Sequence, residues 1–150
     1  MNFTIRKAKK SDSKEIIRLI NELADFEKLT PPDKKAQRRI IRDGFSKNPR
    51  FQILLALEND IAIGYAFYFY SYSTFLARPT LYLEDIFISE NYRGYGIGKK
   101  LFLNLVKIAK QKKCGRVEWL VLDWNKTAID FYKKLGSKEM KEWKFFRLTL

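Results

Sequence analysis

The sequence predicts an α/β fold in which a mixed, mostly antiparallel central sheet of six to seven strands carries helices on both faces. The first observation is the order of apolar patterns, which places hairpin strands in the first half and a strand-helix-strand unit in the second. The second is size: 150 residues, 46% of them hydrophobic, suit one domain spanning residues 1–150.

The first third of the chain is expected to contain one strand and two helices. Residues 3–6 alternate as a short strand, and apolar residues at three- and four-residue steps predict a helix over residues 12–27. Pro31 and Pro32 close that region. A second, strongly basic helix is expected over residues 33–46, since Asn48-Pro49 ends the pattern.

Three strands follow in the expected order, over residues 51–57, 61–70 and 80–88. The polar break Glu58-Asn59-Asp60 predicts that the first two form an antiparallel hairpin. Residues 61–77 carry no formal charge and approach membrane-span length. Their two-residue aromatic alternation instead favours a buried strand, and no membrane association is expected.

A glycine-rich segment then opens a helix that begins near Gly98 and ends at Cys114-Gly115. A strand over residues 116–122, a helix over 126–135 and one or two strands before Leu150 complete the prediction. The strand-helix-strand order makes its two strands parallel and sets the helix N-terminus at the edge of the sheet where anions bind.

Composition excludes several kinds of chemistry. The absence of histidine removes Ser/His and Cys/His nucleophile pairs and His-ligated zinc, and no metal site is expected. A single cysteine, Cys114, fits a reducing compartment, so a cytoplasmic location is expected. The net charge of +13 requires either a polyanionic partner or a solvated basic surface.

The segment Arg93-Gly94-Tyr95-Gly96-Ile97-Gly98 stands between a strand and a helix, where glycines allow backbone N–H groups to approach a phosphate. An ordinary turn before a helix is the alternative. Lys100 stands where a P-loop needs Ser or Thr, and the glycine spacing differs from a dinucleotide fingerprint.

The motif Arg-Gly-x-Gly-Ile-Gly after an apolar strand resembles the acetyl-coenzyme A loop of the GCN5-related N-acetyltransferase (GNAT) superfamily. Within it, residues 81–88, 92–98 and 130–133 and the pair Trp124-Asn125 are similar to diamine acetyltransferases, the spermidine/spermine N1-acetyltransferase group. The resemblance covers almost the whole chain. It implies a GNAT fold, acetyl-CoA as cosubstrate and a homodimer.

Two residues are expected to move protons. Glu84, beside Asp85 in an apolar strand, is the candidate base that takes a proton from the amine, and a surface ion pair is the alternative. Tyr132 is the candidate acid that protonates the departing sulfur, and core packing is the alternative. The resemblance places both at catalytic positions, although Asp130 replaces the usual Asn.

The resemblance also implies binding residues. Expected cofactor contacts involve Ile86, Phe87, Ile88, Arg93, Gly94, Tyr95, Gly96, Ile97, Gly98, Lys99, Asn125, Lys126, Thr127 and Ala128. Expected substrate contacts involve Phe26, Glu27, Glu84, Asp85 and Glu142. Asn125 can equally serve as the N-cap of its helix.

These observations predict acetyl transfer from acetyl-CoA to a primary amine of a polyamine or diamine-like molecule, by direct attack in a ternary complex. The segment after Gly136 is shorter than in the family, so a thialysine, other amino-acid or protein acceptor is an alternative. A basic, non-enzymatic nucleic-acid-binding protein is the alternative from another class, disfavoured because the basic residues are spread over several helices.

Overall fold

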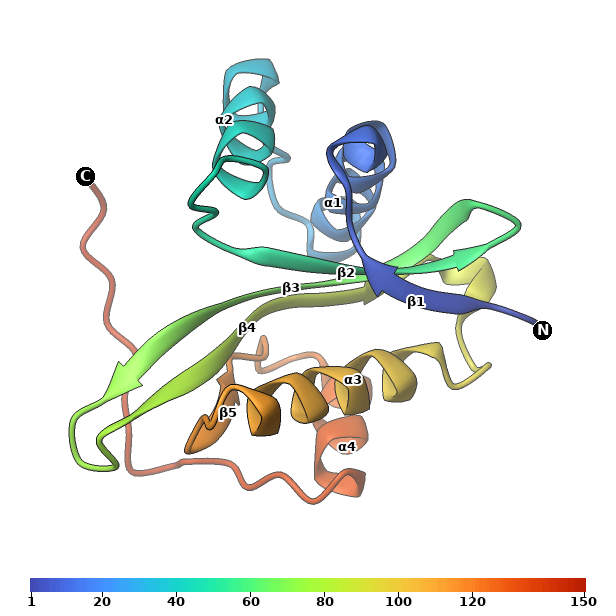
Figure 1. The fold of residues 1–150 in the computed structure, drawn as a ribbon. Coiled ribbons are helices and arrows are strands. Elements are labelled where there is room, and N and C mark those ends of the chain that lie inside the picture. Colours follow the sequence, from blue (N-terminus) through green and yellow to red (C-terminus); the bar gives the residue numbers. More distant parts are fainter. The chain divides into compact units, whose positions relative to one another are not determined.

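A five-stranded sheet organises the first 119 residues of the computed structural model, which describes all 150 residues (Figure 1). The strands follow chain order, antiparallel from the first to the fourth, with the fifth parallel to the fourth. They are β1 (Thr4–Lys7), β2 (Gln52–Glu58), β3 (Ile61–Ser73), β4 (Arg78–Ile88) and β5 (Arg116–Trp119).

The predicted hairpin between β2 and β3 is confirmed. Asn59 and Asp60 form its two-residue turn, with φ angles of 48° and 65°, the left-handed values that such a tight turn requires. The five central residues of β2, 53–57, are all buried, so both faces of this strand are covered. This explains why β2 reads as a continuous apolar run rather than an alternating one.

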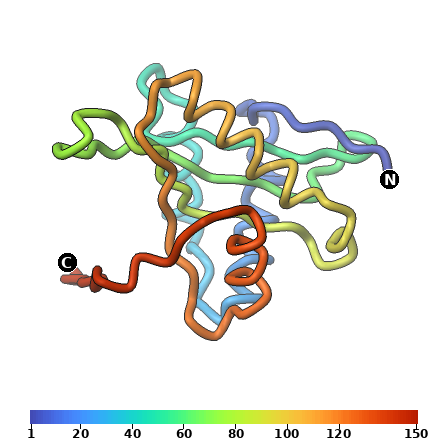
Figure 2. The backbone as a smooth tube through the Cα atoms, turned by 90° about the horizontal axis from the view of Figure 1, so that it is seen from below, coloured from blue at the N-terminus to red at the C-terminus, as the bar shows by residue number.

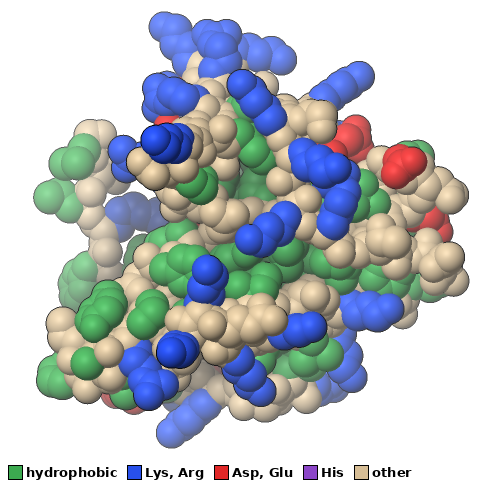
Figure 3. All heavy atoms as spheres, viewed as in Figure 1, with side chains coloured by type: hydrophobic (Ala, Val, Ile, Leu, Met, Phe, Trp, Pro, Cys, Tyr) green, Lys and Arg blue, Asp and Glu red, His purple; other side chains and the backbone are tan.

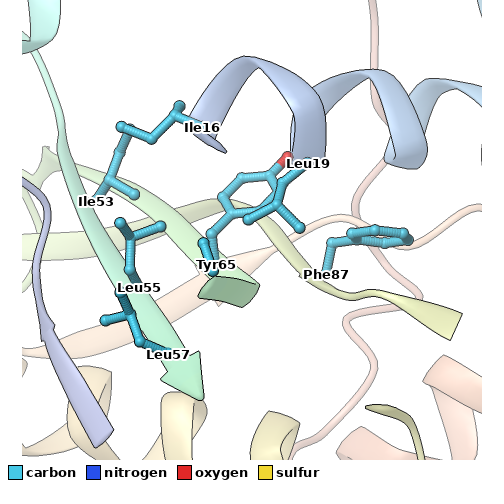
Figure 4. Packing of buried hydrophobic residues seen from close by; sticks show 8 residues of the cluster. Ile16, Leu19, Ile53, Leu55, Leu57, Tyr65 and Phe87 are labelled. Atoms are coloured by element: carbon cyan, nitrogen blue, oxygen red, sulfur yellow. The ribbon is translucent and has the colours of Figure 1, made fainter. Parts of the chain in front are cut away.

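Helices α1 (Ser13–Glu27) and α2 (Lys34–Gly44) lie on one face of the sheet, and α3 (Ile97–Gln111) lies on the other, as predicted (Figure 1). Beneath α1, Ile16 and Leu19 pack with Leu55 and Tyr65 of the sheet (Figure 4). From below, α3 crosses the strands diagonally (Figure 2). Its buried stripe includes Leu101, Phe102 and Leu105.

The β4–α3–β5 unit has the predicted parallel geometry. Residues 80–83 of β4 pair with residues 116–119 of β5, and α3 connects the two strands across one face of the sheet. Strand β5 ends at Trp119 rather than at the expected Leu122. This early end leaves the last five residues of β4 without a partner strand on that edge.

Residues 120–150 form a second compact unit. Its helix α4 (Lys126–Lys134) is capped by Asn125, whose side chain accepts a hydrogen bond from the Ala128 N–H at 3.2 Å. The strands expected before Leu150 are absent, so the predicted six to seven strands are corrected to five. No strand of the sheet pairs with the segment after α4, and side chains in that segment, including those of Phe146 and Leu148, are exposed.

The basic side chains are dispersed. Figure 3 shows Lys and Arg side chains scattered over the visible face and concentrated only at the exposed end of α2, whose sequence includes five of them. None of the four helices combines the length and apolar character that a membrane-spanning helix needs.

Two leucines of α3 offer a matched test of this core. Leu105 is completely buried, whereas Leu103 is 49% exposed. We expect Leu105→Ala to lower the free energy of unfolding by about 2–5 kcal/mol, because it removes buried methyl groups and leaves a cavity. Leu103→Ala changes helix propensity equally and should cost less than about 1 kcal/mol. Urea denaturation measures both, and equal losses would contradict the assigned packing.

Candidate active site

The centre of the candidate site is a β-bulge in β4. Phe67 of β3 pairs with Asp85, and the next residue, Tyr68, pairs with Leu83, so Glu84 is left without a partner. A bulge re-aims the side chain at that position and bends the strand. Glu84 is accordingly exposed, although it stands between buried Leu83 and half-buried Asp85.

Beyond the bulge, one edge of β4 is open. The Ser89 N–H donates to the Ile63 carbonyl of β3 at 3.0 Å, so by strand alternation the backbone groups of Ile86 and Ile88 point to the opposite edge. Strand β5 pairs with β4 only as far as Leu83 and does not reach them. The Ile86 N–H is thus available to an oxygen acceptor. The side chain of Phe87, which lies between these two residues in the sequence, packs under α1.

Three acidic or phenolic groups meet on the α1 face beside the bulge. The Tyr65 hydroxyl donates to Asp85 Oδ2 over 3.4 Å, a long hydrogen bond. Burial, together with the charges of Glu84 and Glu27, raises the pKa of Asp85 to about 7, and the hydrogen bond from Tyr65 acts in the opposite direction. Burial also raises the pKa of Glu27, at the end of α1.

Tyr65 is a site residue that the sequence analysis did not identify. Its pKa lies well above the usual tyrosine value because the side chain is buried and Asp85 is close. Because Tyr65 lies in a strand rich in aromatic residues, its sequence context indicates only a core residue. The pairing register of the hairpin could have identified it, since Tyr65 lies opposite Phe87 and therefore near Asp85 on the same face of the sheet.

The glycine loop forms the expected opening at the N-terminus of α3. Gly94 and Gly96 have φ angles of 85° and 78°, and a Cβ atom at either would meet nothing within 4 Å. Gly96 is the N-cap and supplies no side-chain acceptor, whereas Asp33 and Asn125 cap α2 and α4. The first N–H groups of α3 therefore have no internal partner and can bind an anion.

Arg93 is engaged on the α1 side of the sheet. Its guanidinium carbon lies 4.7 Å from the ring centroid of Phe26 and 5.4 Å from that of Phe87. Its Nε donates to the Ile88 carbonyl at 3.0 Å. The side chain thus links the end of α1 to the end of β4, in addition to standing at the start of the glycine loop.

The structure brings together the predicted residues Phe26, Glu27, Glu84 and Asp85, beside the open edge and the glycine loop of the first unit. The first unit also contains the predicted cofactor contacts Ile86, Phe87, Ile88 and residues 93–99, and the second unit contains Asn125, Lys126, Thr127, Ala128, Tyr132 and Glu142. There Tyr132 is the buried residue of α4 and its ring contacts Phe131, Lys126 and Thr127 form the first turn, and Glu142 is exposed in the following segment. The catalytic and binding roles of these residues stay predictions.

Comparison with proteins of known sequence identifies relatives. Residues 15–137 match the acetyltransferase (GNAT) family. The chain is 40% identical to a thialysine N-epsilon-acetyltransferase of Sus scrofa over 95% of this chain and 90% of that protein. It is 34% identical to a human spermidine/spermine N(1)-acetyltransferase-like protein, over 98% of this chain and 22% of that protein. An L-ornithine N5-acetyltransferase of Arabidopsis thaliana is 46% identical over 61% of this chain and 40% of its own length.

Solved structures share the fold. An integron cassette protein from V. cholerae superposes with a TM-score of 0.86 at 25% identity, covering 99% of this chain and 93% of its own. A possible acetyltransferase from Clostridium difficile gives a TM-score of 0.87 at 17% identity over 100% and 99% of the two chains. The fold and the match over most of the sequence together show that this chain belongs to the GNAT acetyltransferase family.

Proposed function

We propose that the protein is an acetyl-CoA-dependent N-acetyltransferase that acts on the primary amine of a small molecule through a ternary complex. The observation that carries this proposal is the position of the carboxylates Glu84 and Asp85 at a bulge, directly before an open strand edge and an uncapped helix N-terminus. The carboxylates suit a cationic amine, and the helix N-terminus with its unpaired N–H groups suits an anionic acyl donor.

The open edge and the glycine loop fit acetyl-CoA, which supplies an activated acetyl thioester. In this proposal the N–H groups from Gly94 to Lys99 bind its diphosphate, aided by the positive end of α3 and by Lys99. The Ile86 N–H stabilises negative charge on the acetyl oxygen. Asn125, Lys126, Thr127 and Ala128 are proposed to add contacts, although the Ala128 N–H is already occupied by the Asn125 cap.

An alkylammonium acceptor must lose a proton before its nitrogen attacks the thioester carbon. Glu84 is the proposed base, because it is the exposed carboxylate at the bulge. Asp85 is a second candidate, since its pKa of about 7 suits proton exchange near neutral pH. As the C–N bond forms and the C–S bond breaks, Tyr132 is proposed to give a proton to the sulfur.

The acceptor is proposed to be an aliphatic diamine, polyamine or amino acid with a side-chain amine. The relatives' names specify thialysine, spermidine/spermine and L-ornithine, all of which present an amine on a flexible chain. Phe26 and Glu27 at the end of α1, with Asp85, are the proposed acceptor contacts, and Glu142 is a further one. A protein acceptor is an outcome that the assay below can detect.

We further propose that the chain acts as one N-acetyltransferase domain, because the family match at residues 15–137 spans both compact units. A homodimer and a cytoplasmic location are proposed from the resemblance and from the single cysteine.

The proposed function is tested by measuring thiol release from acetyl-CoA with spermidine, spermine, putrescine, thialysine, lysine, ornithine and peptides. We expect turnover with at least one small amine and acetyl-CoA binding measurable by calorimetry. Glu84→Gln should lower turnover most at low pH and least at high pH, where free amine is abundant. Binding to generic DNA without acetyl-CoA binding would overturn the proposal.

The role of Tyr132 is tested with Tyr132→Phe. We expect kcat to fall by about 100-fold or more, because proton transfer to the sulfur is lost, while the KM for acetyl-CoA changes little. Tyr72→Phe is the control, since that tyrosine is 66% exposed and outside the site. Unchanged kcat in Tyr132→Phe would remove this residue from the acid role.

The link between Tyr65 and Asp85 predicts a pH effect. The Tyr65 hydroxyl stabilises the ionised carboxylate, so Tyr65→Phe should raise the pKa of Asp85 above its value of about 7. Since a protonated carboxyl cannot accept a proton, the acid limb of the kcat/KM profile should move to higher pH in this variant.

Tyr68→Phe is the matched control for that experiment. Tyr68 belongs to the same strand and is also fully buried, and no carboxylate contributes to its raised pKa. An acid limb that moves equally in both variants, or in neither, would contradict a titration governed by Asp85.

A further inference from the structure

A cleft of about 600 Å³ lies on the α1 face beside the proposed acceptor carboxylates. Its walls come from α1, from the beginning of β3 and from the end of β4 with the following turn η2 (Glu90–Tyr92). Phe26 and Phe87 line it. Phe26 immediately precedes Glu27, and Phe87 lies on the same face as Asp85 two residues along the strand. We call it the α1–β4 cleft.

Some charges of the α1–β4 cleft are satisfied within the chain. Arg18 donates to Glu15 at 2.8 Å and to Glu22, and it also contacts the Ala62 carbonyl. The second oxygen of Glu22 accepts a hydrogen bond from the Ser89 hydroxyl at 2.6 Å. This network pairs the single guanidinium of Arg18 with two carboxylates, so every charged side chain in it has a partner and one net negative charge remains.

Other charges of the cleft have no partner. The carboxylates of Asp25 and Glu90 line the cleft and take part in no ion pair or side-chain hydrogen bond of the structure. The Arg93 guanidinium uses only Nε, on the Ile88 carbonyl, and its ring contacts hold it over Phe26 and Phe87. Its two terminal nitrogens remain available, in the fork geometry that matches a carboxylate.

We propose that the α1–β4 cleft binds the zwitterionic α-amino-acid end of the acceptor, with the α-carboxylate on Arg93 and the α-ammonium between Asp25 and Glu90. This inference rests on the proposed function and narrows its acceptor to amino acids with a side-chain amine. An amino acid has both a carboxylate for the Arg93 guanidinium and an ammonium for the two unpaired carboxylates. The end of a polyamine carries only positive charge and leaves the Arg93 guanidinium unpaired beside another cation.

The dimensions agree with this assignment. Asp85 and Phe87 are two residues apart on one strand face, a separation of about 6.8 Å. The extended side chain of lysine or ornithine covers a span of this order. With the amino-acid end beside Phe87 and Arg93, the side-chain amine reaches the carboxylates at the bulge. The cleft therefore also determines which of the two amines is acetylated.

Three acceptors that share one terminal amine test the assignment: lysine, cadaverine, which lacks the carboxylate, and 6-aminohexanoate, which lacks the α-ammonium. We expect kcat/KM for lysine to exceed that for cadaverine by about tenfold or more, as loss of a charge-assisted hydrogen bond predicts. The acetyl group should be found on the side-chain amine by NMR. Ornithine and putrescine repeat the comparison with a shorter chain.

Variants assign the two charges separately. Arg93→Gln should bring the lysine-to-cadaverine ratio of kcat/KM towards one, and the ratio cancels any effect of this residue on acetyl-CoA because both acceptors use the same donor. Glu90→Gln should bring the lysine-to-6-aminohexanoate ratio towards one in the same way. Thermal melting of each variant checks that it is folded, and Asp25→Asn gives an independent second variant.

The outcomes are distinguishable. Acetylation of cadaverine at least as efficient as that of lysine, acetylation of the α-amine, or a ratio unchanged in Arg93→Gln would overturn the cleft assignment while leaving the proposed acetyl transfer intact. Failure of every amine to release coenzyme A would instead overturn the proposed function. A tenfold preference for lysine that disappears in Arg93→Gln supports both.

Discussion

The candidate site depends on a difference between the two edges of β4. On one edge the strand pairs with β3 along its length, apart from the bulge at Glu84, and on the other it pairs with β5 only up to Leu83. The first edge fixes β4 in the core, and the second presents unpaired backbone groups. Placing the bulge where the second pairing ends lets one strand hold acidic side chains on one side and offer hydrogen-bond donors on the other.

Burying Asp85 at this position has a cost in stability. The pKa of Asp85 rises from an ordinary value of 3.8 to about 7, and one pKa unit corresponds to about 1.4 kcal/mol. Ionised Asp85 therefore destabilises the folded state by roughly 4 kcal/mol above pH 7, and this penalty develops as pH rises from about 4. The buried hydrophobic cluster around Leu19, Leu55 and Tyr65 compensates for part of it.

Much of the fold could be predicted because local signals were strong. The turn at Asn59 and Asp60 and the apolar stripes of α1 and α3 led to elements within about two residues of those observed. The prediction of strands before Leu150 was wrong, because aromatic and aliphatic residues such as Phe145 and Leu148 are typical of strands whether or not a neighbouring strand is there to pair with them. Whether a pairing strand is present depends on the whole fold and cannot be deduced from the local sequence.

The types of residue in the candidate site could be predicted from the sequence, but most of the contacts between their side chains could not. Glu84, Asp85 and the glycine loop stand out in the sequence because carboxylates interrupt an apolar strand and glycines open a helix. Tyr65 was hidden among aromatic residues, since nothing local separates a phenol that faces a carboxylate from one that only packs. The position of the Arg93 guanidinium over Phe26 and Phe87 likewise depends on α1, which is far away in sequence.

The uncapped start of α3 has a consequence for the evolution of this chain. A Ser or Asp in place of Gly96 would ordinarily add a few tenths of a kcal/mol, roughly, to helix stability. Here it would place an oxygen where the ligand's phosphate is proposed to bind, and the φ of 78° at Gly96 would strain it as well. In the proposed complex the bound anion would act as the cap that the sequence omits, so that ligand binding and the order of the first turn of α3 would be coupled.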